Sequence, residues 1–105
     1  MADRLVLCRI EEIESGDARR FDVGGLRIAL VRIGDDFYAI GDRCTHEDYS
    51  LAEGEVWEDE LELECPRHGS TFSLTTGEAA SLPATTAVPV YEVNVSEGEV
   101  AVLVP

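Results

Sequence analysis

Polar and apolar residues alternate with a period of two along most of this sequence, and turn residues interrupt the alternation at short intervals. Leu61, Leu63 and Cys65, for example, face one way, and the glutamates between them face the other. Such alternation is typical of a strand with one buried face. The same pattern extends over residues 4–10, 19–23, 26–33, 37–40, 90–95 and 100–105.

No segment has a convincing helical spacing of apolar residues, and residues 10–20 are too short and too interrupted by glycine to predict a helix. Gly24 and Gly25 join two strand segments directly, and residues 96–99 (SEGE) join two more, which indicates β-hairpins. The sequence therefore predicts an all-β fold of short antiparallel strands, a sandwich or a barrel. At 105 residues, the chain is expected to be a single domain, 1–105.

The charge balance excludes some partners. Asp and Glu number 22 against 8 Lys and Arg, a formal net charge of −14. Such a surface repels nucleic acid and anionic membranes and favours basic protein partners, although solubility alone would also explain it. The first ten residues have no basic segment followed by an apolar run, and no stretch approaches about 20 apolar residues. We therefore expect a cytoplasmic protein with reduced thiols.

Two stretches, 41–56 and 65–72, break the strand pattern and contain both histidines and two of the three cysteines. The spacing is Cys44-x-His46, eighteen residues, then Cys65-x-x-His68. Thiolates and imidazoles suit zinc or iron–sulfur chemistry, and short spacing lets one tight loop aim two ligands at one centre. These four residues are the candidate metal ligands.

Neighbouring residues support this interpretation. Pro66 restricts the backbone beside Cys65, and Gly69 permits a sharp turn directly after His68. Cys8, in contrast, sits in an alternating strand, where we expect a buried and inert thiol.

The two motifs resemble the ligand loops of Rieske iron–sulfur proteins. In that family two cysteines hold one iron of a 2Fe–2S cluster and two histidines hold the other. The resemblance implies one cluster per chain, with Cys44 and Cys65 on one iron and His46 and His68 on the other. Residues 44–56, 68–79 and 81–95 are similar to segments of the Rieske-type ferredoxins that serve ring-hydroxylating oxygenases.

The resemblance also implies a fold: a β-sandwich of small antiparallel sheets, with a cluster-binding subdomain over about residues 42–83. Pro83 matches a third, proline-containing loop of the family. Rieske proteins of cytochrome bc complexes bridge their loops with two further cysteines, but here the matching residues are Tyr49 and Arg67. This departure favours the ferredoxin branch.

Neutral imidazoles in place of thiolates make a Rieske centre easier to reduce than an all-cysteine cluster, with potentials of roughly −150 to +300 mV. Ser70 matches a serine whose hydroxyl lies near the cluster sulfurs in the family, but Phe72 replaces a tyrosine. Glu47 and Asp48 would oppose reduction if they lie close to the cluster. We expect the low part of the range.

The resemblance implies a monomeric one-electron carrier, not an enzyme, that takes electrons from a flavin-dependent ferredoxin reductase and passes them to a terminal oxygenase. A structural Cys2His2 zinc module is an alternative. An accessory or small subunit of another redox enzyme, or of an iron–sulfur assembly system, is a further alternative.

Docking would bring a partner to the exposed edges of the two iron-bound histidines. Acidic residues in and between the ligand loops would attract a basic partner: Glu47, Asp48, Glu53, Glu55, Glu58, Asp59 and Glu60. The alternative is an apolar rim around Tyr49, Leu51 and Pro66.

Overall fold

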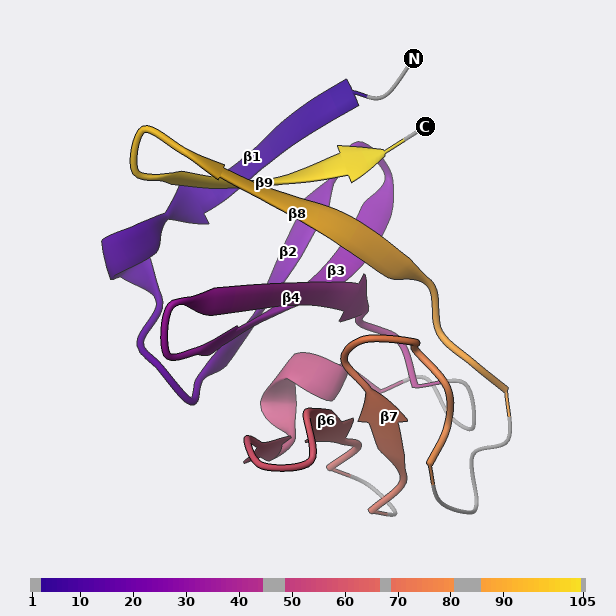
Figure 1. Ribbon diagram of the computed structural model, residues 1–105. Coiled ribbons are helices and arrows are strands. Elements are labelled where there is room, and N and C mark those ends of the chain that lie inside the picture. Colours follow the sequence, from indigo (N-terminus) through magenta and orange to yellow (C-terminus); the bar gives the residue numbers. More distant parts are fainter. Residues whose placement is uncertain (1–2, 45–48, 67–68, 81–85, 105) are drawn as a thin grey trace.

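A computed structural model describes residues 3–44, 49–66, 69–80 and 86–104, which form two antiparallel sheets (Figure 1). Within these residues no helix is long and apolar enough to cross a membrane. The elements in chain order are β1 (Asp3–Arg9), the 3-10 turn η1 (Ile10–Glu12), β2 (Ala18–Val23), β3 (Leu26–Ile33), β4 (Asp36–Gly41), the 3-10 turn η2 (Leu51–Glu53), β5 (Val56–Trp57), β6 (Glu62–Glu64), β7 (Thr71–Ser73), β8 (Val90–Ser96) and β9 (Glu99–Val104).

The larger sheet has six strands in the order β1-β9-β8-β4-β3-β2, and it curls around a core of its own. Cys8 of β1, Leu30 of β3, Ala39 of β4 and Val100 of β9 belong to one buried cluster. Strands that are far apart in the sheet order therefore share one interior. The predicted all-β fold is confirmed.

The predicted hairpins are also confirmed, and their turn residues have the required backbone. Gly24 and Gly25 both have positive φ, +56° and +79°, between the paired residues Val23 and Leu26. A two-residue turn with both φ values positive matches the right-handed twist of its strands.

Strand β3 joins the two parts of the molecule because it is buried on both faces. Ile28 and Leu30 point into the core of the curled sheet, whereas Ala29 and Val31 belong to a second cluster. The smaller sheet, in the order β5-β6-β7, contributes to that second cluster. The period-two alternation of β3 thus separates the two cores, and the smaller sheet packs against the outer face of the larger one.

Some elements were not predicted. Residues 65–72 were expected to be irregular, but β7 begins at Thr71, and neither β5 nor η2 was expected. These elements have only two or three residues, and no longer alternating stretch was recognised around them as it was around β6. All three lie within the predicted subdomain, about 42–83, whose boundaries remain a prediction.

Candidate metal centre

The first loop is closed at its base by a short antiparallel pairing that continues from β4. The N–H of Cys44 donates to the carbonyl of Tyr49 (3.0 Å), and Arg43 forms an isolated bridge with Ser50. These contacts pair residues 43–44 with residues 49–50, the two ends of the first loop. We call this paired base, residues 43–44 and 49–50, the neck of the first loop. Cys44 lies in the neck, where hydrogen bonds hold the backbone.

The second loop has the same construction at the end of the β6–β7 hairpin. The N–H of Cys65 donates to the carbonyl of Ser70 (2.6 Å), and the N–H of Gly69 donates to the carbonyl of Cys65 (3.1 Å). Gly69 has a φ of +75°, a conformation that glycine adopts without strain. Pro66 is exposed at the start of the loop. The predicted tight turn is confirmed at the residues that the structure describes.

The two loop cysteines come together in one buried cluster. Cys44 is 2% exposed and Cys65 is 1% exposed, and both belong to the core cluster that also contains Leu51, Leu63 and Phe72. None of the three cysteines is in a disulfide. Two thiols from separate, backbone-pinned loops in one buried environment are a donor set that suits iron or zinc. The cysteine half of the predicted site therefore fits an iron–sulfur cluster.

The histidine half lies outside the described residues. Accordingly, no group of three or more His, Cys, Asp or Glu able to hold a metal is found within 3–44, 49–66, 69–80 and 86–104. The assignment of His46 and His68 as ligands stays a prediction. The same holds for three further features of the sequence: Glu47 and Asp48, Arg67, and Pro83.

Cys8 has a different environment from the loop cysteines. It lies on β1 in the core of the curled sheet and is 6% exposed. Burial raises the pKa of its thiol, and the nearby carboxylate of Glu12 raises it further. A protonated, buried thiol remote from both loops is a core residue, as predicted.

Two residues beside the second loop, Ser70 and Phe72, differ in whether they bring a hydroxyl group close to it. Ser70 is 1% exposed, so its hydroxyl is inside the protein at the neck of the second loop. Phe72 is fully buried and pairs with Leu63 across β6 and β7, where it fills the core without providing a hydroxyl.

The predicted apolar rim is wrong at one residue. Leu51 is 0% exposed and belongs to the core, because η2 turns its side chain inward against the smaller sheet. Pro66 is exposed and Tyr49 is partly buried. Trp57, which was not predicted to be exposed, is 39% exposed on β5. The predicted acidic residues of this region that the structure describes are all exposed: Glu53, Glu55, Glu58, Asp59 and Glu60.

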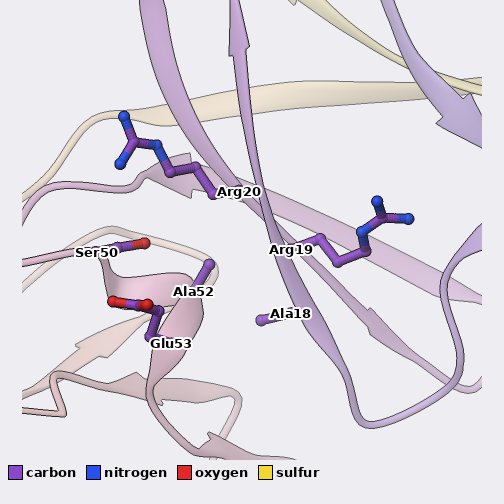
Figure 2. Close-up of a pocket in the computed structure, with 6 residues that line it drawn as sticks. All are labelled: Ala18, Arg19, Arg20, Ser50, Ala52 and Glu53. Carbon is purple, nitrogen blue, oxygen red and sulfur yellow. The ribbon is translucent and has the colours of Figure 1, made fainter.

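A shallow pocket of about 310 Å³ lies between β2 and η2 (Figure 2). Ser50, Ala52 and Glu53 line one side, and β2 lines the other with three residues that include Arg20. The guanidinium of Arg20 lies on the side of Ser50, whereas that of Arg19 points away (Figure 2). The pocket adjoins the neck of the first loop.

Comparison with known proteins agrees with the loop geometry. The model of the Rieske [2Fe-2S] domain family matches residues 3–92. The ferredoxin subunit of 3-phenylpropionate/cinnamic acid dioxygenase from Escherichia coli (strain K12) is 40% identical over 103 residues, which cover 98% of this chain and 95% of that protein.

Solved structures agree as well. The ferredoxin of carbazole 1,9a-dioxygenase from Nocardioides aromaticivorans IC177 matches with a TM-score of 0.91 and 33% identity, over 94% of this chain and 95% of that one. A ferredoxin in a complex of reduced oxygenase and oxidized ferredoxin in carbazole 1,9a-dioxygenase matches with a TM-score of 0.85 and 44% identity, over 94% and 91%. With a family match over most of its length and two buried cysteines at the necks of adjacent loops, this chain belongs to the Rieske [2Fe-2S] domain family, whose cofactor is a 2Fe–2S cluster.

Proposed function

We propose that this protein is a Rieske ferredoxin that carries single electrons from a flavin-dependent reductase to the terminal oxygenase of a ring-hydroxylating system. The observation that carries the proposal is that Cys44 and Cys65 lie in one buried cluster of a chain that matches a dioxygenase ferredoxin subunit over 98% of its length. A carrier needs a redox centre near its surface and no substrate-converting machinery, and the relatives are electron-carrier subunits.

The proposed ligands are Cys44 and Cys65 on one iron and His46 and His68 on the other. The bound cluster supplies a site that accepts and returns one electron. The chain's contribution is to fix the cysteine sulfurs: each backbone N–H is engaged across its own loop neck, and apolar residues exclude water around both. A dry and rigid setting lowers the reorganisation that accompanies a change of charge.

The proposed partners differ in their support. The carbazole 1,9a-dioxygenase ferredoxin occurs in a complex with its oxygenase, and this supports an oxygenase as the acceptor here. The reductase is proposed on chemical grounds: where a two-electron donor such as reduced nicotinamide supplies the electrons, a flavin can take up the pair and release it one electron at a time. We further propose that the protein acts as a monomer with one cluster per chain.

The test is a two-step electron transfer with the holoprotein. A flavin-dependent reductase with its reduced nicotinamide should bleach the visible absorbance by one electron per chain, and oxidised terminal oxygenase should then restore it. Cys8→Ala serves as the matched control for Cys65→Ala, because both remove a buried thiol. We expect Cys8→Ala to retain both steps and Cys65→Ala to lose them. Holoprotein that no such reductase reduces, or that no such oxygenase reoxidises, would contradict the proposal.

A further inference from the structure

Asp42 is a buried carboxylate at the base of the first loop. It follows the last residue of β4 and precedes Cys44 by two residues, and its side chain is 0% exposed. Burying an ionised carboxylate is costly unless it is paired and hydrogen-bonded. A carboxylate buried at this position therefore requires specific polar partners.

On one side, Asp42 holds the segment that returns from the loop. Its carbonyl accepts the N–H of Leu51 (2.7 Å), and its Oδ1 accepts the N–H of Ala52 (2.9 Å). Both donors belong to η2, the first element after the neck. The carbonyl and the side chain of Asp42, just before the first loop, thus bind the segment that follows the loop.

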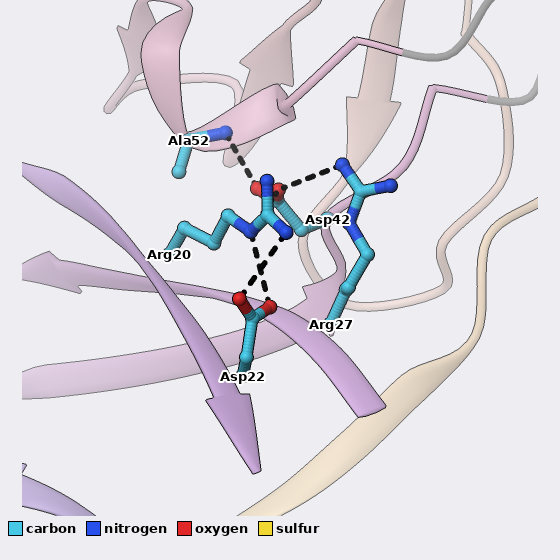
Figure 3. Close-up of polar contacts among 5 residues, drawn as sticks. All are labelled: Arg20, Asp22, Arg27, Asp42 and Ala52. Atoms are coloured by element: carbon cyan, nitrogen blue, oxygen red, sulfur yellow. Dashed lines mark hydrogen bonds and ion pairs between the residues drawn. The ribbon is translucent and has the colours of Figure 1, made fainter. Parts of the chain in front are cut away.

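On the other side, Asp42 is held by two strands of the larger sheet (Figure 3). Its N–H donates to the carbonyl of Arg27 on β3 (3.0 Å), and its Oδ2 lies 3.8 Å from Nη2 of the same arginine. Oδ2 also lies 3.7 Å from Nε of Arg20 on β2. Arg20 is itself oriented by two hydrogen bonds to Asp22, at 3.1 and 3.2 Å.

A shallow, open pocket lies along this side of Asp42. The pocket of about 310 Å³ lies between β2 and η2, and Arg20 lines it. The ion pair from Arg20 to Asp42 therefore connects β2 with the loop base beside a gap that side chains leave open. Asp42 is fully buried, whereas the side chains of Arg20 and Arg27 are 40% and 32% exposed. Losing an arginine would therefore leave the buried carboxylate less compensated, whereas either arginine could be solvated without Asp42.

We propose that Asp42 is a positioning residue for the cluster: it fastens the first cysteine loop to the larger sheet and so fixes Cys44 relative to Cys65. The proposal rests on the ligand set given under the proposed function. Residues that orient metal ligands without touching the metal change metal retention by roughly 10–100-fold when they are removed. Asp42 acts on Cys44 through the backbone that joins them.

The experiment compares holoprotein carrying Asp42→Ala, Asp42→Asn or the control Asp35→Asn with the unaltered chain. Asp35→Asn also removes a carboxylate beside an arginine, Arg32, but this side chain is fully exposed between β3 and β4 and touches neither Asp42 nor either loop in the contacts described. The measurements are the EPR spectrum after reduction and the rate of cluster loss to an iron chelator, with the unfolding midpoint measured separately.

We expect Asp42→Ala to broaden the EPR spectrum and to speed cluster loss by roughly 10-fold or more. Asp42→Asn keeps an acceptor for the Ala52 N–H, so its rate of cluster loss should lie between those of Asp42→Ala and the unaltered chain. If Asp42→Ala does not fold, the comparison of Asp42→Asn with the unaltered chain is the test. Asp35→Asn should match the unaltered chain.

A lower unfolding midpoint with unchanged spectrum and loss rate in both Asp42 variants would make the residue merely structural and overturn the inference. An equal effect of Asp35→Asn would also overturn it. An unaltered chain without a Rieske-type spectrum would instead overturn the ligand set, so the two failures are distinguishable.

Discussion

The three cysteines show how one side chain takes different roles in different backbone settings. Cys44 and Cys65 lie at the necks of loops, where neighbouring backbone is held by hydrogen bonds across each loop. Cys8 lies within β1, and its side chain faces the core of the curled sheet. Position relative to a loop neck, more than burial, separates the proposed ligands from the core thiol, because all three are buried.

The thiol of Cys8 should resist alkylation in the holoprotein. Burial raises its pKa, so at pH 7–8 less of it is the reactive thiolate than in an unfolded chain. Iodoacetamide followed by mass spectrometry should show almost no modification of native holoprotein. The control is the unfolded, cluster-free chain, in which all three cysteines should react. Rapid modification of Cys8 in the native state would contradict its assignment.

The charge of the proposed ligands sets the direction of the potential. His68→Cys replaces a neutral ligand with an anionic one, which stabilises the oxidised cluster, so the potential should fall. A redox titration followed by EPR measures this in the variant and the unaltered chain. A potential that stays the same or rises in a variant that retains its cluster would show that residue 68 does not bind iron.

At the scale of elements, the smaller sheet depends on one close approach of two backbones. Gly54 directly follows η2, and a Cβ added there would overlap the carbonyl oxygen of Glu64 on β6. Its φ of −86° suits any residue, so the requirement for glycine is steric. This contact holds the first loop's return segment against the strand that leads to Cys65.

Gly54→Ala should therefore destabilise the fold by about 3 kcal/mol or more, as overpacking of a rigid contact does. Gly25→Ala is the matched control: a Cβ there meets nothing within 4 Å, and only its φ of +79° is costly, at about 1–2 kcal/mol. Urea unfolding of both variants measures the difference. Equal losses of stability would show that backbone contact at Gly54 does not limit the fold.

Sequence periodicity was sufficient for the long strands and for β6, which lies within the alternating residues 61–65, but not for β5 and β7. Strand β3 alternates between two cores over eight residues, so its pattern is strong and its prediction was confirmed. Strands β5 and β7 have two and three residues, and their pairing depends on tertiary contacts. Leu51 was misplaced for the same reason, since η2 directs it inward and no local pattern indicated that turn.

Of the site, spacing alone indicated the four candidate ligands, and the described structure brings both cysteines into one cluster. Asp42 was missed because an aspartate near a turn usually faces water. Its burial results from contacts with Arg20 and Arg27, which are distant in the sequence. Only the folded chain brings those three residues together.

At the scale of the whole molecule, we expect charge to govern how fast the protein associates with its redox partners. The net charge is −14, and residues 49–66 and 69–80 contain acidic residues but no lysine or arginine. Raising ionic strength should slow reduction by the partner reductase steeply, because the Debye length shrinks to about 8 Å at physiological salt.

Charge reversal at Glu58 or Glu60, exposed residues between β5 and β6, should flatten this dependence. Glu97→Lys is the matched control, because it makes the same charge change in the β8–β9 hairpin, at the end of the molecule away from the smaller sheet (Figure 1). A reduction rate that does not respond to salt would favour docking through apolar contacts, with Trp57 and Pro66 the exposed candidates.

The most direct test of the central claim is pulsed EPR on reduced holoprotein grown with ¹⁵N-labelled histidine, together with iron and sulfide analysis. We predict two irons and two sulfides per chain and strong couplings from two histidine nitrogens, one of which should vanish in His46→Cys and the other in His68→Cys. A cluster without histidine couplings, or a colourless folded protein with stoichiometric zinc, would contradict the account.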